Sequence, residues 1–526
     1  MAVVRPTLGP YKPEPVQRLV TTAAERWPDR IAVIDGDRRY TFHELNETAD
    51  KLAVALADMG IGKGDFVGIL APNCMAFVVS FFGILKSGAI VTTINSGYRE
   101  IEVANQLRAS GAATLIVHES LVDVAALAAK DVATLKQTII IKEEAADASS
   151  FWGLIENAKG VPPTFDVDPA EELAALPFSS GTTGLSKGVM LTHANLHANV
   201  RQLKDREEET AMREGDMVLV HLPLFHIYAM MIMQQAIYAG STQVMMGRFD
   251  MELFLPLIQE HRINVLFTAP PVGVALSQTP LVDDYDVSSL RFIMFGAAPM
   301  SAELQLRIQE RMGTSVVQGY GLTETSPVSH MDFNDDRAKP GTIGPPLGDV
   351  EQRVVDMEDG VTDLASGELG ELLLRGPNVM KGYYNEPEAT ANAITPEGWF
   401  HTGDLVTMDD DGYVTVLDRK KELIKYSGFQ VPPAELEGIL LEHPAVADVA
   451  VIGKENLETG EIPKAFVVKK AGANVTGEEL MDYVADQVAT FKRVREVEFV
   501  ESIPKNPSGK LLRRVLVEQE RAKAQG

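Results

Sequence analysis

The sequence predicts an α/β protein with a large N-terminal domain of mixed sheets packed by helices and a small C-terminal α+β domain. The chain has 526 residues, more than one hydrophobic core usually organises, and 45% of them are hydrophobic, enough for two cores. Short apolar runs rich in β-forming residues recur, each followed by a Gly or Pro turn and a helical pattern. Beyond Asp418 a charged run leads into a compact set of alternating patterns, so we place the domains at 1–418 and 419–526.

The clearest apolar runs indicate strands that are buried on both faces, as in a largely parallel sheet. After the last of these runs a turn leads to Ser301, which can cap a helix, and to Gly313, which can end it. Ligands in such sheets gather at loops that follow strands, so these turns are candidate site segments. The runs are 66–70, 114–117, 265–268 and 292–295.

Composition excludes several classes of protein. The chain has 48 basic and 74 acidic residues, a net charge of −26 that repels nucleic acid and anionic membranes. Its longest apolar run, 76–85, is about half the length that spans a bilayer, and no basic-then-apolar leader opens the chain, so we expect a cytoplasmic protein without a membrane span.

The single cysteine, Cys74, has apolar neighbours and is expected to be a buried thiol. Residues 141–170 are expected to be a surface connection.

A segment rich in glycine and hydroxyl groups, 178–188, is a candidate phosphate-binding loop. It holds three glycines, four hydroxyl side chains besides that of Ser179, and one lysine, Lys187. Such a loop can surround phosphate oxygens with backbone N–H, hydroxyl and ammonium donors. The phosphate loop of ATPases and kinases needs Gly, four residues and then Gly-Lys-Ser/Thr, whereas counting from Gly181 this chain gives Ser-Lys-Gly. The kinase-type interpretation therefore fails on spacing.

This segment resembles the signature of the adenylate-forming superfamily, which includes acyl-CoA synthetases, 4-coumarate–CoA ligases, firefly luciferase and peptide-synthetase adenylation domains. The resemblance covers roughly residues 15 to 515. Ser186 departs from the proline that many members carry, which removes no donor. The resemblance implies ATP and Mg²⁺ as cofactors, with Thr183 as a metal ligand. The residues expected at the phosphates are Ser179, Ser180, Gly181, Thr182, Thr183, Gly184 and Lys187.

Residues 318–324 resemble the family's adenine- and magnesium-binding segment. Glycines let a flat ring approach the backbone, Tyr320 offers a stacking face, and Glu324 offers a hard oxygen ligand for Mg²⁺. A plainer reading, in which Thr323 and Glu324 begin a helix, stays open. The turn at 296–298 resembles the strand that covers the adenine and the acyl group. The residues expected at the adenine are Gly296, Ala297, Ala298, Gln318, Gly319, Tyr320, Gly321 and Thr323.

Two residues near the domain boundary are expected at the ribose. Asp404 resembles the family's aspartate that accepts both ribose hydroxyls, a task that suits two acceptor oxygens. Arg419 resembles a second ribose and phosphate contact. Lys421 matches the hinge position, where a few backbone torsions let a mobile small domain turn. In isolation these residues would be an ordinary turn and a solvated linker.

The small domain carries two further segments of the resemblance. Lys510, at the end of 504–510, resembles the catalytic lysine, a cation that could touch both the substrate carboxylate and the triphosphate. A solvated lysine in an exposed tail is the alternative. Residues 422–430 resemble the face presented for thioester formation, with Gly428 near the pantetheine. The other contacts expected on this face are Lys425, Ser427 and Gln430.

The segment 222–228 matches the 4-coumarate–CoA ligase version of the acyl-site motif. His226 is expected between the acyl pocket and the path of the thiol, with a core histidine as the alternative. Arg248 matches a basic position that contacts a coenzyme A phosphate in relatives. The pocket is expected to be apolar and rich in methionine. Its expected lining is His226, Ile227, Tyr228, Met230, Met231, Ala298, Met300, Gly319, Pro327, Val328 and Met331.

The resemblance implies an AMP-forming carboxylic acid–CoA ligase. The substrate carboxylate would displace pyrophosphate from ATP, and the thiolate of coenzyme A would then attack the acyl-adenylate and release AMP. Aryl-propenoic, aromatic and medium- or long-chain fatty acids all suit such a pocket. We expect a monomer or homodimer with a carboxylic acid and coenzyme A as its partners and no nucleic acid.

Three alternatives stay open. The closest is an acyl-AMP ligase that loads a carrier protein, but relatives of that type usually carry an insertion that is not seen between Thr325 and Asp404. A luciferase-like oxidase depends on its substrate more than on a motif. A non-catalytic nucleotide sensor would not require Lys510, because binding alone needs no lysine from a mobile domain.

Overall fold

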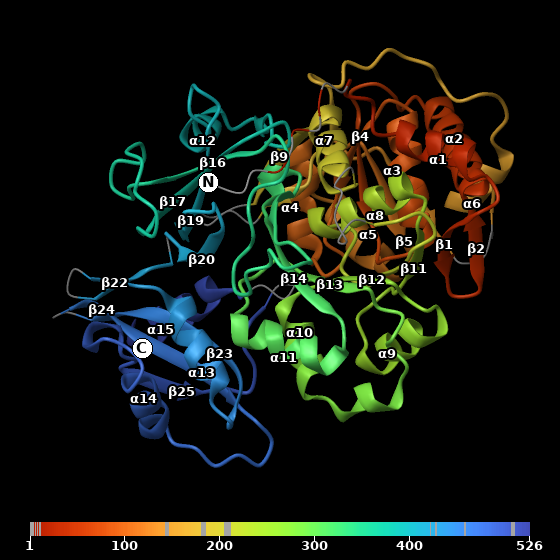
Figure 1. Ribbon diagram of the computed structural model, residues 1–526. Coiled ribbons are helices and arrows are strands. Elements are labelled where there is room, and N and C mark those ends of the chain that lie inside the picture. Colours follow the sequence, from red (N-terminus) through yellow and green to blue (C-terminus); the bar gives the residue numbers. More distant parts are fainter. Residues whose placement is uncertain are drawn as a thin grey trace.

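The computed structural model describes Arg5, Thr7, Gly9 and residues 12–142, 147–179, 186–204, 212–420, 422–426, 429–456, 459–505 and 511–525, without the side chains of 429, 430, 524 and 525. These residues form four β-sheets, three of which precede residue 420, with helices packed around them (Figure 1). The predicted α/β class, with a large N-terminal domain of mixed sheets and a smaller C-terminal domain, is confirmed.

The first eight-stranded sheet has the order β18-β9-β7-β4-β3-β5-β6, with β8 paired to β9. The predicted runs 66–70 and 114–117 are its parallel neighbours β3 and β5, with Val67 opposite Thr114. Towards β18 the sheet turns antiparallel, since β9 pairs in that sense with β7, β8 and β18. The strands are β3 (Phe66–Leu70), β4 (Ile90–Thr93), β5 (Thr114–His118), β6 (Gln137–Ile141), β7 (Leu173–Ala175), β8 (Phe178–Ser179), β9 (Lys187–Thr192) and β18 (Gly382–Tyr383).

The second eight-stranded sheet has the order β15-β14-β13-β12-β10-β11-β1-β2. The predicted runs 265–268 and 292–295 are the parallel neighbours β12 and β13, with Val265 opposite Phe292. Antiparallel strands close both edges. The strands are β1 (Ile31–Asp35), β2 (Arg38–Thr41), β10 (Met217–Val220), β11 (Thr242–Met245), β12 (Val265–Thr268), β13 (Phe292–Phe295), β14 (Ser315–Gly321) and β15 (Val328–Met331).

The third sheet is antiparallel and has the order β16-β17-β19-β20. Its last pair places Asp404 directly opposite Arg419, at the point where the chain leaves for the C-terminal domain. The strands are β16 (Glu351–Val355), β17 (Gly370–Arg375), β19 (Phe400–Met408) and β20 (Val414–Arg419).

Helices fill the space between the two large sheets and cover their outer faces. The described helices before residue 420 are α1 (Arg18–Arg26), α2 (Phe42–Asp58), α3 (Met75–Lys86), α4 (Glu100–Ser110), α5 (Val122–Ala129), α6 (Phe151–Asn157), α7 (His193–Lys204), α8 (Ile227–Ala239), α9 (Met251–Glu260), α10 (Pro270–Gln278), α11 (Ala302–Met312) and α12 (Pro387–Ala393), with 3₁₀ turns η1 (Glu119–Leu121), η2 (Pro280–Asp284) and η3 (Thr323–Thr325).

Helix α3 explains the longest apolar run of the sequence. Every residue of α3 is buried, and the largest core joins it to α2, α8 and strands of both large sheets. A Cβ atom on Gly83 would lie 2.6 Å from Cδ2 of Leu52, so this glycine lets α2 and α3 approach closely. No helix in the described part of the chain is long and apolar enough to cross a membrane.

The predicted ends of α11 agree with the structure, whereas one predicted surface segment does not. The Ser301 hydroxyl accepts the N–H of Leu304 at the start of α11, and Gly313 ends the helix with a φ of 61°. The expectation of a surface connection over 141–170 was wrong in part. Residues 151–157 form α6, which buries Phe151 in the main core because an amphipathic turn follows the Ser150 cap.

The C-terminal domain has its own five-stranded sheet, in the order β22-β21-β24-β23 with β25 beside β24, and a core made only of its own residues. In Figure 1 it lies in blue beneath the third sheet and beside α10 and α11. Its elements are β21 (Ile424–Tyr426), β22 (Phe429–Val431), α13 (Pro433–Glu442), β23 (Val446–Asn456), β24 (Gly460–Lys469), α14 (Gly477–Ala485), η4 (Thr490–Lys492), β25 (Glu496–Phe499) and α15 (Arg513–Gln525).

Candidate active site

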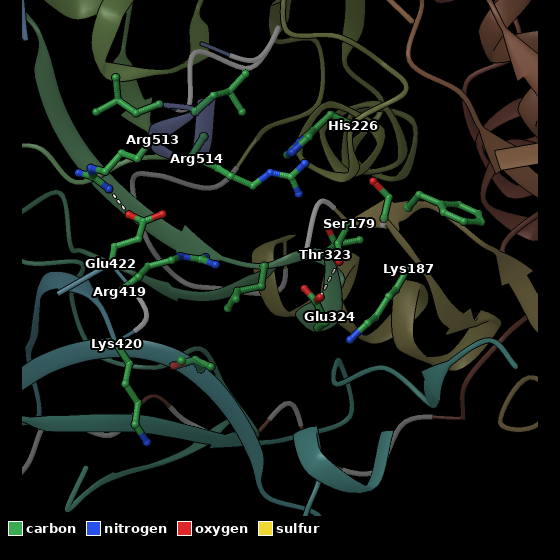
Figure 2. A pocket seen from close by; sticks show the side chains of 18 of the residues that line it. Ser179, Lys187, His226, Thr323, Glu324, Arg419, Lys420, Glu422, Arg513 and Arg514 are labelled. Carbon is green, nitrogen blue, oxygen red and sulfur yellow. Dashed lines mark hydrogen bonds and ion pairs between the residues drawn. The ribbon is translucent and has the colours of Figure 1, made fainter. Parts of the chain in front are cut away.

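A cavity of about 1970 Å³ opens where the strand ends of the large domain face the C-terminal domain (Figure 2). Its wall combines segments that are far apart in sequence, from β8 and β9, the start of α8, the ends of β13 and β14, β19, β20, β23 and α15. The residues singled out from the sequence that line it are Ser179, Lys187, His226, Ile227, Tyr228, Gly296, Ala297, Gly319, Tyr320, Gly321, Thr323, Glu324, Pro327, Val328 and Arg419.

Glu324 presents a carboxylate to this cavity from the 3₁₀ turn η3, just after β14. Its side chain is 8% exposed, and Oε1 accepts the hydroxyl of Ser179 at 2.9 Å and that of Tyr383 at 3.0 Å. Within the described part of the chain, Glu324 forms no ion pair. Its negative charge is therefore held by neutral donors, an arrangement that suits an incoming cation.

The two ends of the predicted phosphate loop meet at the cavity. Ser179 on β8 pairs with Lys187 on β9, so the strands that flank the loop run side by side. The ammonium of Lys187 lies 5.1 Å from the centre of the Tyr383 ring. The remaining loop residues that were singled out lie outside the described residues, namely Ser180, Gly181, Thr182, Thr183 and Gly184.

Asp404 links the second and third sheets through its carboxylate. Oδ2 accepts the hydroxyl of Tyr320 from β14, and Oδ1 pairs with Nε of Arg419 at 2.9 Å. Asp404 is buried and does not itself line the cavity, whereas Tyr320 and Arg419 do. The neighbouring Asp404 carboxylate raises the pKa of Arg419 against the opposing effect of burial. Tyr320 and Arg419 therefore form one polar edge of the cavity, and the buried Asp404 carboxylate holds both side chains from behind.

The glycines at the end of β14 are needed for packing as well as for access. A Cβ atom on Gly321 would lie 2.1 Å from the carbonyl oxygen of Pro327, so a larger residue would separate β14 from β15. Ala297, at the turn after β13, has a left-handed backbone with a φ of 71°. Such a conformation costs energy in a residue with a Cβ atom and is frequent at functional sites.

His226 stands at the N-terminus of α8 and lines the cavity. Its Nδ1 accepts the N–H of Tyr228 at 3.3 Å, which satisfies one of the open backbone donors of the helix. The Tyr228 hydroxyl donates to the carbonyl oxygen of Met294 at 3.3 Å, and burial raises the pKa of Tyr228. The ring of Tyr228 lies 3.2 Å from the position of a Cβ atom on Gly296, so this glycine admits the ring.

The expected methionine-rich lining differs from the observed one. The methionines Met230, Met231, Met300 and Met331 are buried in hydrophobic cores and do not line this cavity. Met230 and Met231 lie on α8, which is buried almost all round, so its hydrophobic pattern cannot mark one face. Met294 lines the cavity instead, together with the aromatic rings of Phe178, Phe225 and Phe400.

Two further residues expected at the nucleotide lie outside the cavity wall. Ala298 is half-buried in the turn after β13. The Gln318 amide exchanges hydrogen bonds with the backbone of Met300 and donates to Gln305, so it fastens α11 to β14.

Of the predicted coenzyme A contacts, the two whose side chains are described, Arg248 and Lys425, do not line the cavity. Arg248 is exposed beyond β11, and Lys425 is exposed on β21. Gln430 lies on β22, but its side chain is not described. Lys421, Ser427, Gly428 and Lys510 lie outside the described residues.

The structure adds cavity residues that no motif indicated. Tyr383, on the edge strand β18, contacts both Glu324 and Lys187. Arg513 and Arg514 enter from the start of α15 (Figure 2). No local pattern in the sequence marks Arg513 and Arg514, and nothing near Tyr383 indicates the pairing of its strand with β9.

Arg513 is the centre of an ion cluster where the two domains join. Its Nε and Nη2 donate to both oxygens of Glu437 on α13, at 3.1 and 2.6 Å, and Nη1 donates to Glu422. Asp418, at the end of β20, lies 4.0 Å from Nη1 and accepts the N–H of Ala434 at 2.8 Å. Burial raises the pKa of Asp418 to about 6. The cluster therefore ties α13 and α15 to the last strand of the large domain.

Comparisons with known proteins agree with this geometry. The family model described as "AMP-binding enzyme" matches residues 20–384, and "AMP-binding enzyme C-terminal domain" matches residues 435–510. A 4-coumarate–CoA ligase from Pinus taeda is 41% identical over 93% of this chain and 91% of its own length.

Two solved structures of similar proteins cover nearly the whole chain. ATP-bound MatB from Rhodopseudomonas palustris has a TM-score of 0.86 and 28% identity, over 96% of this chain and 99% of that one. The anthranilate CoA ligase AuaEII, in complex with anthranoyl-AMP, has a TM-score of 0.89 and 26% identity, over 98% of both chains.

Proposed function

The chain belongs to the AMP-binding enzyme family and is an AMP-forming acid–CoA ligase, and we propose that the acid it activates is an aryl-propenoic acid or a related aromatic acid. The observation that carries the proposal is that one cavity brings these groups together. It is lined by Glu324, Lys187 and the His226 segment, and by Tyr320 and Arg419, which Asp404 holds. These groups offer a cation ligand, a phosphate donor, a polar edge and an apolar wall.

The first half-reaction needs charge stabilisation more than a protein nucleophile. The acid's carboxylate attacks the α-phosphorus of ATP, and pyrophosphate leaves. Lys187 would donate to phosphate oxygens, and Lys510 would bridge the carboxylate and the α-phosphate as negative charge redistributes. Asp404 would accept hydrogen bonds from the ribose hydroxyls. Each of its two oxygens would then be shared, because one already accepts a hydrogen bond from Tyr320 and the other already pairs with Arg419.

Magnesium fits the oxygen donors near Glu324. This carboxylate has only neutral hydroxyl partners among the described residues, and Mg²⁺ usually binds one or two carboxylates together with substrate phosphates and water. Glu324 and Thr183 would hold the ion, and a bound Mg²⁺ would neutralise part of the negative charge of the phosphates. The described residues contain no cluster of three His, Cys, Asp or Glu, so substrate oxygens and water would complete the coordination.

The second half-reaction requires another face of the C-terminal domain. The thiolate of coenzyme A attacks the carbonyl of the acyl-adenylate, and AMP leaves. We place the domain boundary after Asp418 and the hinge at Lys421, so that rotation would exchange Lys510 for the segment with Lys425, Ser427, Gly428 and Gln430. Arg248 remains a proposed contact for a coenzyme A phosphate. His226, at the end of α8, would gate the path of the thiol.

The wall beside His226 favours a flat aromatic acid. Phe178, Phe225 and Tyr228 line this part of the cavity, with Ile227, Pro327 and Val328 nearby in the same wall. Aromatic rings gain from edge and face contacts beyond their burial of apolar area. An aryl-propenoate would place its ring against this wall and extend its carboxylate towards the phosphates.

A panel of acids tests the proposed substrate. We expect 4-coumarate and cinnamate to give thioester with Mg-ATP and coenzyme A at a kcat/KM at least about tenfold above that of octanoate, which corresponds to about 1.4 kcal/mol. The thioester is followed by chromatography. Preference for octanoate would reject the aromatic assignment in favour of a fatty-acid ligase.

The acceptor and the assembly are tested in the same preparation. We propose free coenzyme A as acceptor, and acyl-adenylate that only a carrier protein discharges would favour the carrier-loading alternative. We further propose a monomer or homodimer in the cytoplasm with no nucleic-acid partner, as the net charge of −26 favours. Light scattering of the purified protein measures the assembly.

A further inference from the structure

Tyr383 lies on a two-residue edge strand and touches two functional candidates. Strand β18 pairs with β9 so that Tyr383 is opposite Val189, two residues from Lys187. The N–H of Tyr383 donates to the hydroxyl of Thr390 at 2.9 Å, which ties the strand to α12. The backbone of Tyr383 is therefore held from both sides, and its ring is directed into the cavity.

The Tyr383 hydroxyl fixes one oxygen of Glu324. It donates to Oε1 at 3.0 Å, and the hydroxyl of Ser179 donates to the same atom at 2.9 Å. The backbone carbonyl of Glu324 accepts the N–H of Met380 at 2.8 Å, so the segment before β18 also holds the main chain of Glu324. Among the described residues, Oε2 accepts no hydrogen bond, which leaves it available to a ligand.

The Tyr383 ring also sets the position of Lys187. The ammonium lies 5.1 Å from the ring centre, a distance at which a cation is attracted to the ring face. Lys187 and Glu324 have opposite charges and line the same cavity, yet they form no ion pair with each other in the described structure. Tyr383 interacts with both side chains, with Glu324 through its hydroxyl and with Lys187 through its ring face.

We propose that Tyr383 is a positioning residue that aims the Glu324 carboxylate at a divalent cation and keeps Lys187 from neutralising it. The inference rests on the proposed function, in which Glu324 binds the cation of Mg-ATP and Lys187 binds phosphate. The neutral hydroxyl keeps the full negative charge on Glu324, which a basic partner would not.

Nucleotide binding by calorimetry tests the two parts of Tyr383 separately. Tyr383→Phe removes the hydroxyl and keeps the ring, so it should weaken ATP binding about 10- to 100-fold with Mg²⁺ present and less than about twofold in EDTA. Tyr383→Leu also removes the ring, so ATP binding in EDTA should fall as well because Lys187 can then pair with Glu324. The effect of removing the ring is therefore measured as ATP binding by Tyr383→Leu in EDTA, where no metal ion is available.

Tyr384→Phe is the matched control, since Tyr384 packs edge-on against Phe66 and does not line the cavity. It should bind ATP as the unmodified protein does under both conditions. Equal losses for Tyr383→Phe with and without Mg²⁺, or no loss beyond that of Tyr384→Phe, would overturn the proposal.

A second readout separates this inference from the proposed function. The Mg²⁺ concentration that half-saturates ATP–pyrophosphate exchange should rise about tenfold in Tyr383→Phe, while thioester formation from supplied acyl-adenylate stays within about twofold. If the protein binds Mg-ATP but releases no pyrophosphate with any acid, the ligase assignment is refuted. The calorimetric result then still decides whether Tyr383 positions Glu324. A parallel loss in both half-reactions would indicate a structural role and reject the proposal.

Discussion

At the scale of single residues, the candidate site is organised around carboxylates in two different environments. Glu324 has only neutral donors at Oε1, whereas Asp404 holds the charged Arg419 and the hydroxyl of Tyr320. The first arrangement leaves a negative charge for a cation. The second uses the charge to hold the second and third sheets together beside the cavity, so Asp404 has a structural role in addition to the ribose-binding role proposed for it.

Asp404→Asn is expected to raise the KM for ATP about 10- to 100-fold, the effect of losing a hydrogen bond to a charged group. The amide has one acceptor oxygen and no charge, so it cannot serve both Arg419 and a ribose diol. The KM for coenzyme A should change less than about twofold. Asp409→Asn is the control, because Asp409 pairs with Lys339 outside the cavity wall. An unchanged KM for ATP in well-folded Asp404→Asn would remove Asp404 from the nucleotide site.

At the scale of elements, the C-terminal domain is fastened to the last strand of the large domain through Arg513. Its guanidinium bridges Glu437 on α13 and Glu422 beyond β20, with Asp418 at 4.0 Å. These carboxylates raise the pKa of Arg513 against the effect of burial. Because the cluster adjoins the proposed hinge, its contacts contribute to the stability of the domain orientation seen here.

Arg513→Met is expected to destabilise the C-terminal domain by about 3–5 kcal/mol, because Glu437 and Asp418 would stay buried without their cation. Urea unfolding monitored by proteolysis of the C-terminal fragment measures the loss. Arg514→Met is the matched control, since Arg514 is 67% exposed and its ion pair within the described part of the chain is with Glu518 on its own helix. Equal stability of the two variants would show that the cluster contributes little.

The two segments of the C-terminal domain that carry proposed roles should be separable by mutation. Lys510→Ala is expected to slow adenylate formation by about two to four orders of magnitude and to leave conversion of supplied acyl-adenylate intact. Gly428→Trp should block the pantetheine path, suppress thioester formation and leave ATP–pyrophosphate exchange nearly unchanged. Both half-reactions are measured for each variant, with thermal melting as the folding control. Equal losses in both half-reactions would contradict the two-face assignment.

At the scale of the whole molecule, Asp332 couples stability to pH. Burial raises the pKa of Asp332 to about 7, against the lowering effects of backbone N–H donors and of Arg5. The folded state then binds a proton that the unfolded state releases near pH 4. The stability from this group is complete below about pH 4 and is lost as the pH rises towards 7.

Asp332→Asn should remove this pH dependence. The free energy of unfolding of Asp332→Asn should exceed that of the unmodified chain by about 2 kcal/mol at pH 5 and by about 4 kcal/mol at pH 8, as the raised pKa requires. Urea unfolding at several pH values measures the difference. Asp335→Asn should give no such gain, because the hydrogen-bonded Arg337 lowers the pKa of Asp335. A difference that does not vary with pH would contradict the account.

Predictions from the sequence succeeded where the physical signal is local. The runs that form β3 and β12 are apolar on both faces, and this continuous apolar pattern is what predicts a buried strand from the sequence. The ends of α11 followed from Ser301 and Gly313, which act within one turn of their own positions. The charged run that begins at Asp418, near the end of β20, likewise lies where one sheet ends and the next begins, although the proposed boundary at residue 418 remains a prediction.

The remaining features depend on contacts that no local pattern encodes. Tyr383 meets Glu324 only because β18 adds to the edge of the first sheet, a pairing between distant segments. Arg513 meets Glu437 through the packing of α15 on the C-terminal sheet. The acyl wall was misjudged because α8 is apolar around its whole circumference, so Met230 and Met231 could not be told from residues facing a cavity.

The most direct test of the central claim is the identity of the nucleotide products. Purified protein is incubated with ATP labelled at the α- and γ-phosphates, Mg²⁺, coenzyme A and 4-coumarate, and the products are separated and counted. We predict AMP, pyrophosphate and thioester in equal amounts, each dependent on the acid. Formation of ADP and phosphate, or release of AMP without regard to the acid, would contradict the assignment of this chain as an AMP-forming acid–CoA ligase.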